Sequence, residues 1–253
     1  MFYGIFHPQV IFNFLFGIVT EIAEFHKRCG GPLKNFNDSE YFREIKKHVF
    51  LSKSSFFHSG FGNIHPWEAQ VMAELVHFFK PKTLFEIGTF NGFSTLHLAQ
   101  NSPEDAVIYT LDLPQDKKEI LLKHDPFKAY RDVYTMKMNS RRLFHDREEA
   151  KKITELFDDT LHFNFFPYYG KMDFVFIDTS HSYQYVKSDT VNAFKMLRPG
   201  GMILWHDFDF IHPSVYLLVK EVARQKTVYF IPRTRWALYI HDEENQKRPL
   251  NLD

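Results

Sequence analysis

From residue 66 onward, short β-rich runs alternate with amphipathic helical segments, and this alternation limits the fold more than any other feature of the chain. The runs TLFEIG and DFVFID are apolar over most of their length and are bounded by turn residues. Such runs are typical of strands that are buried on both faces of a sheet. Strands separated by helices favour a parallel sheet in a doubly wound α/β fold.

The last two predicted strands, TVYFIP and RWALYIH, are joined by so few residues that they can only pair antiparallel. We therefore expect a Rossmann-like, mostly parallel, seven-stranded sheet with helices on both faces and an antiparallel hairpin at its C-terminal end. The other elements expected, in chain order, are a helix from Pro66 to Lys80, a strand over 83–88, a helix over 93–101, a strand over 107–112, a helix over 115–129, a strand over 132–138, a helical stretch over 145–161, a strand over 173–178, a helix over 183–197, a strand over 202–206 and a helix over 213–225.

Residues 1–65 lack this alternation, and we assign them to an N-terminal helical extension, with the α/β domain over 66–253. Its longest nearly uninterrupted apolar run, residues 11–20, is about half of what a bilayer crossing needs. We therefore expect no membrane span, and instead a helix that packs on the domain or pairs two copies in a homodimer. The loop over 51–65, rich in Ser, Gly and aromatic residues, is a candidate lid. The apolar face of the expected helix consists of Val10, Phe14, Ile18, Ile22 and Phe25.

The charge balance and cysteine content exclude several classes of protein. The chain has 31 Lys and Arg against 31 Asp and Glu, so it has no overall attraction for nucleic acid or for anionic lipid. Its single cysteine, Cys29, excludes an intramolecular disulfide framework and a multi-cysteine metal site within one chain. This usage fits a reducing compartment, and we expect a cytoplasmic protein that acts on a small molecule.

The turn after the first predicted strand has the composition of a ligand-binding turn. It reads Glu86-Ile87-Gly88-Thr89-Phe90-Asn91-Gly92-Phe93-Ser94. Glycines let the backbone approach a ligand closely, and the helix that follows offers free N–H groups. Asp112 ends the next predicted strand, where a carboxylate can accept two hydrogen bonds from a ribose diol. The turn therefore predicts a cofactor that contains adenosine.

The same turn argues against two common nucleotide cofactors. A nicotinamide dinucleotide site requires G-x-G-x-x-G, whereas this turn has G-x-x-x-G, and Glu86 would repel a pyrophosphate. The G-K-[ST] of a P-loop is absent from the sequence. A cationic ligand without phosphate, such as S-adenosylmethionine, suits the turn better, and a nicotinamide oxidoreductase is the poorer alternative.

A second group of polar residues follows two later strands. Asp178 ends one strand and His206-Asp207 end the next, so their side chains should meet at the same edge of the sheet. Two carboxylates and an imidazole could bind Mg²⁺, although His206 shifts the preference towards Mn²⁺, Fe²⁺ or Zn²⁺. His181 is a candidate general base that would remove the proton of a substrate hydroxyl. Arg141 and Arg142 are expected to lie on the solvated surface.

Three segments resemble the class I S-adenosylmethionine-dependent methyltransferases, and most closely their small-molecule O-methyltransferase branch. The segments are TLFEIGTFNGFSTLHLA, LD at 111–112, and DFVFIDTSHSYQYVKSDTVNAFKMLRPGGMILWHDF. The resemblance covers about residues 66–240 and implies a reversed seventh strand. His206 departs from the acidic pattern of the metal-dependent relatives. The resemblance implies that the residues that bind the cofactor are Glu86, Gly88, Thr89, Asn91, Gly92, Ser94, Asp112, Asn139, Ser140 and Asp178.

We therefore expect transfer of a methyl group from S-adenosylmethionine to a hydroxyl of a small molecule, such as a sugar or a phenolic metabolite. His181 and Asp178 would be the catalytic residues, and Asp178, His206 and Asp207 would hold an assisting Mg²⁺ or Mn²⁺. Two alternatives stay open. One is an N-methyltransferase of the same fold, and the other is a subunit that binds the cofactor without catalysis.

Overall fold

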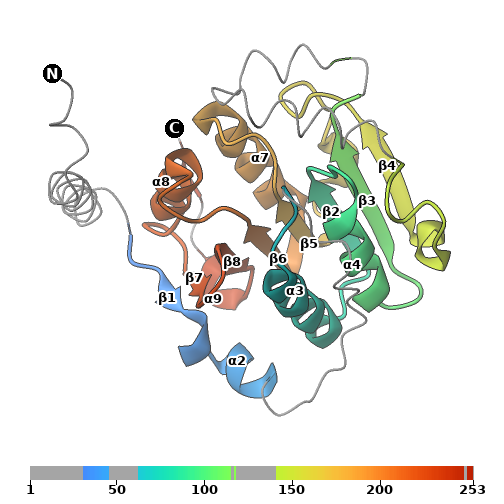
Figure 1. Cartoon of the computed structure of the whole chain (residues 1–253). Helices are drawn as coiled ribbons and strands as arrows, with labels where there is room; N and C mark the ends of the chain where they lie inside the picture. Colours follow the sequence, from blue (N-terminus) through green and yellow to red (C-terminus); the bar gives the residue numbers. More distant parts are fainter. Residues whose placement is uncertain (1–30, 46–61, 115–116, 118–140, 248–249, 253) are drawn as a thin grey trace, which may run out of the picture.

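The computed structural model describes residues 31–45, 62–114, 117, 141–247 and 250–252 and places an eight-stranded sheet at its centre (Figure 1). The strands follow the order β1-β7-β8-β6-β5-β2-β3-β4, and β8 alone among them runs antiparallel to its neighbours. This confirms the predicted mostly parallel sheet with a reversed C-terminal hairpin. The strands are β1 (Lys34–Asn35), β2 (Thr83–Ile87), β3 (Val107–Asp112), β4 (Ile153–Phe157), β5 (Met172–Ile177), β6 (Leu197–Trp205), β7 (Val228–Ile231) and β8 (Trp236–Ile240).

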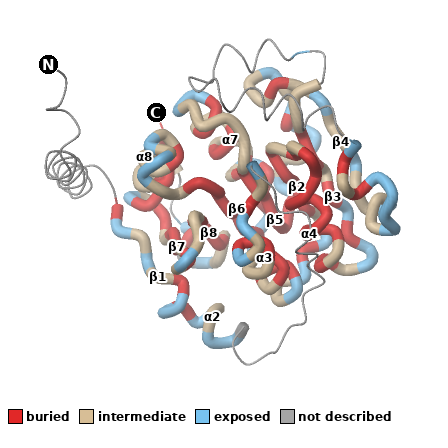
Figure 2. Tube along the Cα trace, viewed as in Figure 1, coloured by how far each residue is buried: buried red, intermediate tan, exposed pale blue. Residues whose placement is uncertain are grey.

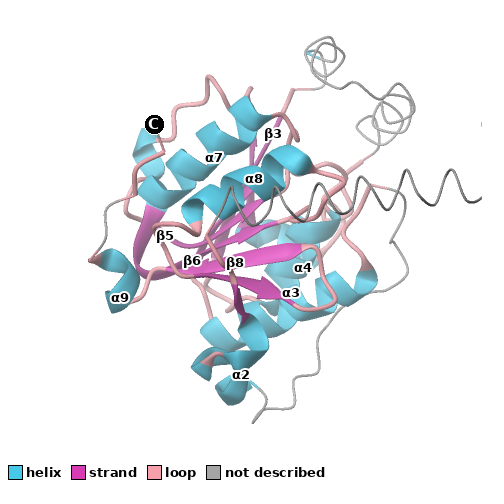
Figure 3. Cartoon of the chain, turned by 90° about the vertical axis from the view of Figure 1, so that its left-hand side faces the viewer, coloured by secondary structure: helices cyan, strands magenta, loops and turns pink. Residues whose placement is uncertain are grey.

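Helices cover both faces of this sheet, with α3 and α4 on one side and α7 and α8 on the other (Figure 3). No helix within the described residues is long and apolar enough to cross a lipid bilayer. The α-helices are α2 (Glu40–Ile45), α3 (Pro66–Phe79), α4 (Phe93–Asn101), α7 (Tyr183–Met196), α8 (Pro213–Val222) and α9 (Glu243–Gln246), and the 3-10 helices are η1 (Phe36–Asp38), η4 (Glu148–Lys152) and η5 (Phe166–Tyr168).

The central strands are buried on both faces because successive side chains point to opposite sides. In β5, Phe174 and Phe176 join the core formed with α3 and α4, whereas Val175 and Ile177 join the core formed with α7 and α8. Figure 2 shows these central strands as buried. Each such apolar side chain contributes about 1.5–3 kcal/mol on burial, which explains why the strand sequences are apolar over most of their length.

The start of α3 is fixed by its first residues. Pro66 occupies the first turn, the His65 side chain accepts a hydrogen bond from the Trp67 N–H, and Glu68 accepts one from the His65 N–H. This capping box satisfies N–H groups that would otherwise lack a partner. It also places Glu68, which is buried, at the end of the helix that faces the strand termini.

Two predicted elements differ from the structure. The stretch 145–161 is not helical, because Glu148–Lys152 form a 3-10 helix and Ile153–Phe157 form β4. The sequence ITELF pairs in register with β3, and this pairing outweighs the helical tendency of the charged residues around it. The extension also contributes a strand, since Lys34–Asn35 pair with β7, which brings the sheet to eight strands instead of seven.

Several predictions fall outside the described residues. They concern the apolar helix before residue 26, Cys29, the lid loop except for 62–65, the helix over 115–129 except for Lys117, the strand over 132–138, and Asn139 and Ser140.

The strand order places a crevice between β2 and β5. The chain leaves β2 through α4 towards β3 on one side and leaves β5 through α7 towards β6 on the other, so the helices that follow the two strands lie on opposite faces of the sheet. In open α/β sheets, ligands bind beyond the carboxyl ends of the strands at such a switch point. Gly88 follows β2 and Asp178 follows β5, which places both groups of predicted site residues at this crevice.

Candidate functional site

The loops after β2 and β5 lie in direct backbone contact at Gly88. Gly88 has a φ of +106°, and a Cβ atom there would lie 1.9 Å from the carbonyl oxygen of Asp178. The Asp178 N–H donates a hydrogen bond of 2.9 Å to the carbonyl of Ile87. Only glycine can combine this backbone conformation with so close an approach. The glycine predicted to contact the cofactor is therefore also required to join the two halves of the site.

The carboxylate of Glu86 is fully buried and is hydrogen-bonded within the protein. It accepts bonds from the hydroxyls of Ser94 at 2.5 Å and Thr110 at 2.6 Å, and from that of Thr95. Burial raises the pKa of Glu86 to about 7 against the opposing effect of these hydroxyls. Because Glu86 has no solvent-exposed surface and its oxygens bond these hydroxyls, the carboxylate does not face a ligand in the way expected from the sequence. It ties α4 and β3 to β2.

The other side chains of the turn also bond to the protein itself. The Thr89 hydroxyl lies 2.6 Å from that of Thr110, and the Asn91 side chain accepts a bond of 3.1 Å from the Phe93 N–H. Gly92 caps α4 with no side-chain hydrogen bond. The N-terminus of α4 therefore presents backbone N–H groups and a partial positive charge, which favour an anionic group of a ligand.

Asp112 is paired with an arginine that the sequence had suggested to be solvated. It accepts hydrogen bonds from the N–H groups of Phe90 at 3.1 Å and Leu113 at 2.9 Å, and from Arg142 Nη2 at 2.8 Å. The Arg142 side chain is only 5% exposed and also pairs with Glu155 at 3.3 Å. The surface prediction for Arg142 is therefore wrong. The second partner of Arg142, Glu155, lies on β4, which pairs with the strand that ends at Asp112. The strand β4 was not predicted from the sequence, and this pairing was therefore missed as well.

At the ends of β5 and β6, His206 is surrounded by three carboxylates. Its Nδ1 lies 3.2 Å from Asp178 Oδ1 and 3.3 Å from Asp207 Oδ1, and its Nε2 lies 3.3 Å from Glu68 Oε2. Burial alone would lower the pKa of His206, but the carboxylates of Asp178 and Asp207 outweigh it and hold the pKa well above its usual value. We therefore treat His206 as an imidazolium, which neutralises part of the negative charge.

Asp207 connects this buried cluster to the solvent-facing His181. Its Oδ2 accepts a bond of 2.6 Å from His181 Nε2, and its Oδ1 accepts one of 2.6 Å from Arg235 Nη1. Burial would raise the pKa of Asp207, but His206 and His181 hold it well below its usual value. Asp207 has a φ of +56°, in the left-handed region that Asp adopts more readily than most residues with a Cβ. The structure therefore keeps Asp207 ionised.

A small pocket opens beside these groups and is lined by Asp178, His181, His206 and Asp207 together with the apolar Val186 and Trp205. The cavity between these side chains is only about 10 Å³, which is room for about one water molecule. The pocket therefore admits a single reacting group, such as a hydroxyl, and not a whole ligand.

The three predicted metal ligands come together, with one ligand atom from each of Asp178, His206 and Asp207 within 4.8 Å of the others. Their donor atoms, however, already face partners in the protein. Both nitrogens of His206 face carboxylates, and both oxygens of Asp207 accept hydrogen bonds. A metal ion there would have to displace the His206 proton and Arg235. This set therefore does not fit a metal in the observed arrangement.

Two residues of the cluster were not predicted. Glu68 lies on α3, and Arg235 lies in the turn between β7 and β8, where its N–H donates to Glu68 Oε1 at 2.8 Å. Neither forms part of a recognisable motif, because each reaches the site only through the tertiary fold. The capping-box spacing after His65 signals the position of Glu68 on its helix but not its contact with His206.

Comparison with known proteins gives one family match. Residues 85–208 match the model of a protein family described as a methyltransferase domain. No curated protein matches the chain significantly.

Solved structures give weak likenesses. The O-methyltransferase TomG from Streptomyces achromogenes, involved in tomaymycin synthesis and solved with S-adenosylmethionine, is 15% identical, with a TM-score of 0.48 over 80% of this chain and 90% of that one. An O-methyltransferase from Bacillus cereus, solved with S-adenosylhomocysteine, is 14% identical, with a TM-score of 0.46 over 81% and 91%.

Proposed function

We propose, from the match of residues 85–208 to the model of a methyltransferase domain, that the protein transfers the methyl group of S-adenosylmethionine to a hydroxyl oxygen of a small molecule. The observation that carries the proposal is the His181–Asp207 pair in the pocket beside the β2–β5 crevice. A methyltransferase that acts on a hydroxyl needs a group that takes up its proton, and this pair provides one at the predicted edge of the sheet.

The cofactor would occupy the crevice after β2. Asp112 would accept hydrogen bonds from the ribose hydroxyls, and the N-terminus of α4, where Gly92 has no side chain, would receive the carboxylate of the methionine part. Gly88 and Gly92 would keep the backbone close to the ligand, while Glu86 would hold the turn in shape through Ser94 and Thr110. This assignment uses the anionic and hydroxyl groups of the cofactor and leaves its sulfonium free to face the pocket.

Methyl transfer would proceed by direct displacement. The acceptor oxygen attacks the methyl carbon, a C–O bond forms, and the S–CH₃ bond breaks with its electrons left on sulfur, which gives neutral S-adenosylhomocysteine. Because an Asp207 carboxylate can only accept, His181 Nε2 carries the hydrogen of their bond, and in the neutral imidazole Nδ1 has the free lone pair. The hydroxyl proton would pass to Nδ1, and Asp207 would stabilise the imidazolium that results.

The lining of the pocket favours a hydroxyl as the reacting group. It combines the polar Asp178 and His206 with the apolar Val186 and Trp205, and a volume of about 10 Å³ admits one such group while the rest of the acceptor stays outside. This arrangement is compatible with both the phenolic and the sugar acceptors expected from the sequence. We propose this class of acceptor and no single compound.

The proposal can be tested with S-adenosylmethionine labelled in its methyl group and a panel of small phenols, sugars and amines. We expect label in an ether product from at least one hydroxyl compound, and none in the amines. His181→Gln should lower kcat by about 10²–10⁴-fold while S-adenosylhomocysteine still binds. Label found only in amines would favour N-methylation, and a fully active His181→Gln variant would remove His181 as the base.

A further inference from the structure

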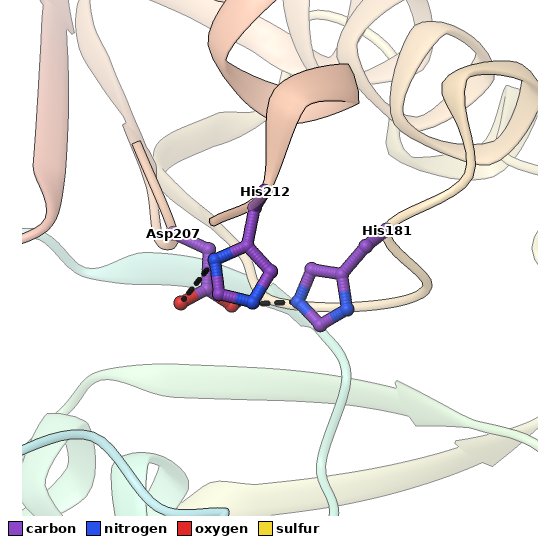
Figure 4. Close-up of side chains that lie close together, drawn as sticks. All are labelled: His181, Asp207 and His212. Carbon is purple, nitrogen blue, oxygen red and sulfur yellow. Dashed lines mark hydrogen bonds and ion pairs between the residues drawn. The ribbon is translucent and has the colours of Figure 1, made fainter. Parts of the chain in front are cut away.

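Two histidines and one carboxylate from two loops meet beside the pocket. His181 follows β5, Asp207 follows β6, and His212 caps the N-terminus of α8. One ligand atom from each residue lies within 4.8 Å of the others, and the two imidazole ring centres are 4.3 Å apart (Figure 4). His212 has no part in the proposed methyl transfer, and only Asp207 is shared with the metal set predicted from the sequence.

The orientation of His212 is fixed by a carboxylate behind it. Its Nδ1 lies 2.9 Å from Asp209 Oδ1, and because an ionised carboxylate only accepts, Nδ1 must carry the hydrogen. The lone pair of the neutral ring is then on Nε2, the nitrogen that Figure 4 shows turned towards His181. A carboxylate that bonds the second nitrogen of a histidine is a regular feature of metal-binding histidines, because it sets the tautomer and the ring orientation.

The spacing between His181 and Asp207 is close to what a metal ion requires. His181 Nε2 and Asp207 Oδ2 are 2.6 Å apart and share one hydrogen. Nitrogen and oxygen ligands at ~2.1 Å from a transition metal lie ~3.0–3.4 Å from each other in octahedral or tetrahedral geometry. The pair would need to open by less than ~1 Å for a metal ion to replace the hydrogen.

Access also distinguishes this cluster from the neighbouring one around His206. The His181 side chain is 38% exposed, whereas that of His206 is 5% exposed. Asp207 keeps its bond to Arg235 through Oδ1, so Oδ2 can bind a metal without displacing the arginine. An ion can therefore reach His181, Asp207 and His212 from solvent, and the exposed side leaves room for water or for an acceptor oxygen.

We propose that His181 Nε2, His212 Nε2 and Asp207 Oδ2 form a binding site for a divalent transition-metal ion. Two imidazole nitrogens and one carboxylate oxygen suit Zn²⁺, Mn²⁺, Fe²⁺ or Co²⁺, whereas Mg²⁺ prefers an all-oxygen set. The metal ion takes the place of the hydrogen on His181 Nε2, and the neutral ring then carries its one hydrogen on Nδ1, so no net proton is released. The ligands come from loops at the ends of two neighbouring strands, β5 and β6, and from the start of α8.

The site has a consequence for methyl transfer, and this part of the inference rests on the proposed function. With a metal ion on Nε2, the neutral His181 ring carries its hydrogen on Nδ1 and cannot accept the proton of the hydroxyl. The metal ion would then assist deprotonation in place of His181, because it lowers the pKa of the acceptor hydroxyl and the proton is lost to solvent. Metal binding itself can be measured without any methyl transfer.

The test uses the full chain, freed of metal by chelation and then dialysed against Zn²⁺, Mn²⁺, Co²⁺ or Mg²⁺ alone. We expect about one Zn²⁺ or Co²⁺ per chain by elemental analysis, visible absorption bands from bound Co²⁺, and no retained Mg²⁺. His212→Gln should weaken Co²⁺ binding at least tenfold. Two control variants should keep Co²⁺ binding. One is His145→Gln, which alters a histidine paired with Glu155, and the other is Asp178→Asn, which alters only the metal set around His206.

Two outcomes would overturn the proposal. One is a wild-type chain that retains none of Zn²⁺, Mn²⁺ and Co²⁺. The other is unchanged Co²⁺ binding in His212→Gln. If Asp178→Asn then loses Co²⁺ binding, the ion belongs to the metal set around His206. Circular dichroism of His212→Gln shows whether the variant is folded. A chain that binds Co²⁺ through His212 but binds no S-adenosylhomocysteine would refute the proposed function and leave the metal site standing.

Discussion

The two halves of the site use their polar residues in opposite ways. In the turn after β2, Glu86, Thr89 and Ser94 are buried and bonded to the protein. At the rim after β5 and β6, His181 remains partly exposed and its partner Asp207 is ionised. The contrast indicates that the turn supplies a rigid shape for a ligand, whereas the rim supplies groups that can exchange protons or bind an ion. Four variants test this difference.

Gly88→Ala should have the largest effect. Its Cβ would lie 1.9 Å from the carbonyl oxygen of Asp178 at a φ of +106°, so we expect a loss of about 4 kcal/mol or more in the free energy of unfolding. Gly170→Ala is the control, because Gly170 has a φ of +69° and an added Cβ would meet nothing within 4 Å, so it should lose only about 1–2 kcal/mol. Urea denaturation measures both, and equal losses would show that the close contact is unimportant.

Glu86→Gln should change the pH dependence of stability. Burial raises the Glu86 pKa from 4.5 to about 7, so the folded state binds a proton that the unfolded state releases, and stability falls as pH rises between these values. Between pH 5 and pH 8 the wild-type chain should lose about 2–3 kcal/mol of its free energy of unfolding through this group, and the variant should not. Burial also raises the pKa of Asp189 to about 7, so some pH dependence remains. Urea denaturation at pH 5 and pH 8 gives the free energy of unfolding of both chains. An equal change between the two pH values in wild type and variant would contradict the assignment.

Asp112→Asn should weaken S-adenosylhomocysteine binding by about tenfold, or about 1.4 kcal/mol, because a charged acceptor of the ribose hydroxyls is lost. Asp105→Asn is a matched control, since Asp105 lies at the surface in an exposed ion pair with Lys82. Isothermal titration gives both affinities. Unchanged affinity in Asp112→Asn would show that Asp112 does not hold the ribose.

His181→Gln should have the smallest effect on stability and on cofactor affinity. The side chain is 38% exposed and pairs with Asp207 at the rim of the pocket, so we expect a loss of less than about 1 kcal/mol in stability. The dissociation constant of S-adenosylhomocysteine should stay within about twofold of the wild-type value. A large loss of affinity would place His181 in the cofactor site instead of at the acceptor.

Local patterns in the sequence were sufficient for the elements that build the crevice. The strand over 107–112 and the helix over 93–101 were predicted with the bounds that the structure shows, and the reversal of β8 followed from the short connection before it. The strand β4 was missed because its five residues lie among charged residues with helical tendency, and its identity depends on pairing with β3.

The missed site residues depend on contacts between distant parts of the chain. Glu68 meets His206 across 138 positions, and Arg142 meets Asp112 across 30. Neither contact follows from local spacing, because helix and strand periodicity determine which face a residue occupies but not its partner on another element. The residues that follow strand ends were easier to predict, because parallel strands place their ends at one edge of the sheet.

The most direct test of the central claim is isothermal titration of the wild-type chain, after chelation of metals, with S-adenosylhomocysteine and separately with NAD⁺. We predict micromolar binding of one S-adenosylhomocysteine per chain and no binding of NAD⁺. A chain that binds no S-adenosylhomocysteine, or that binds NAD⁺ in its place, would contradict the assignment of the β2–β5 crevice to a methyl-donor cofactor.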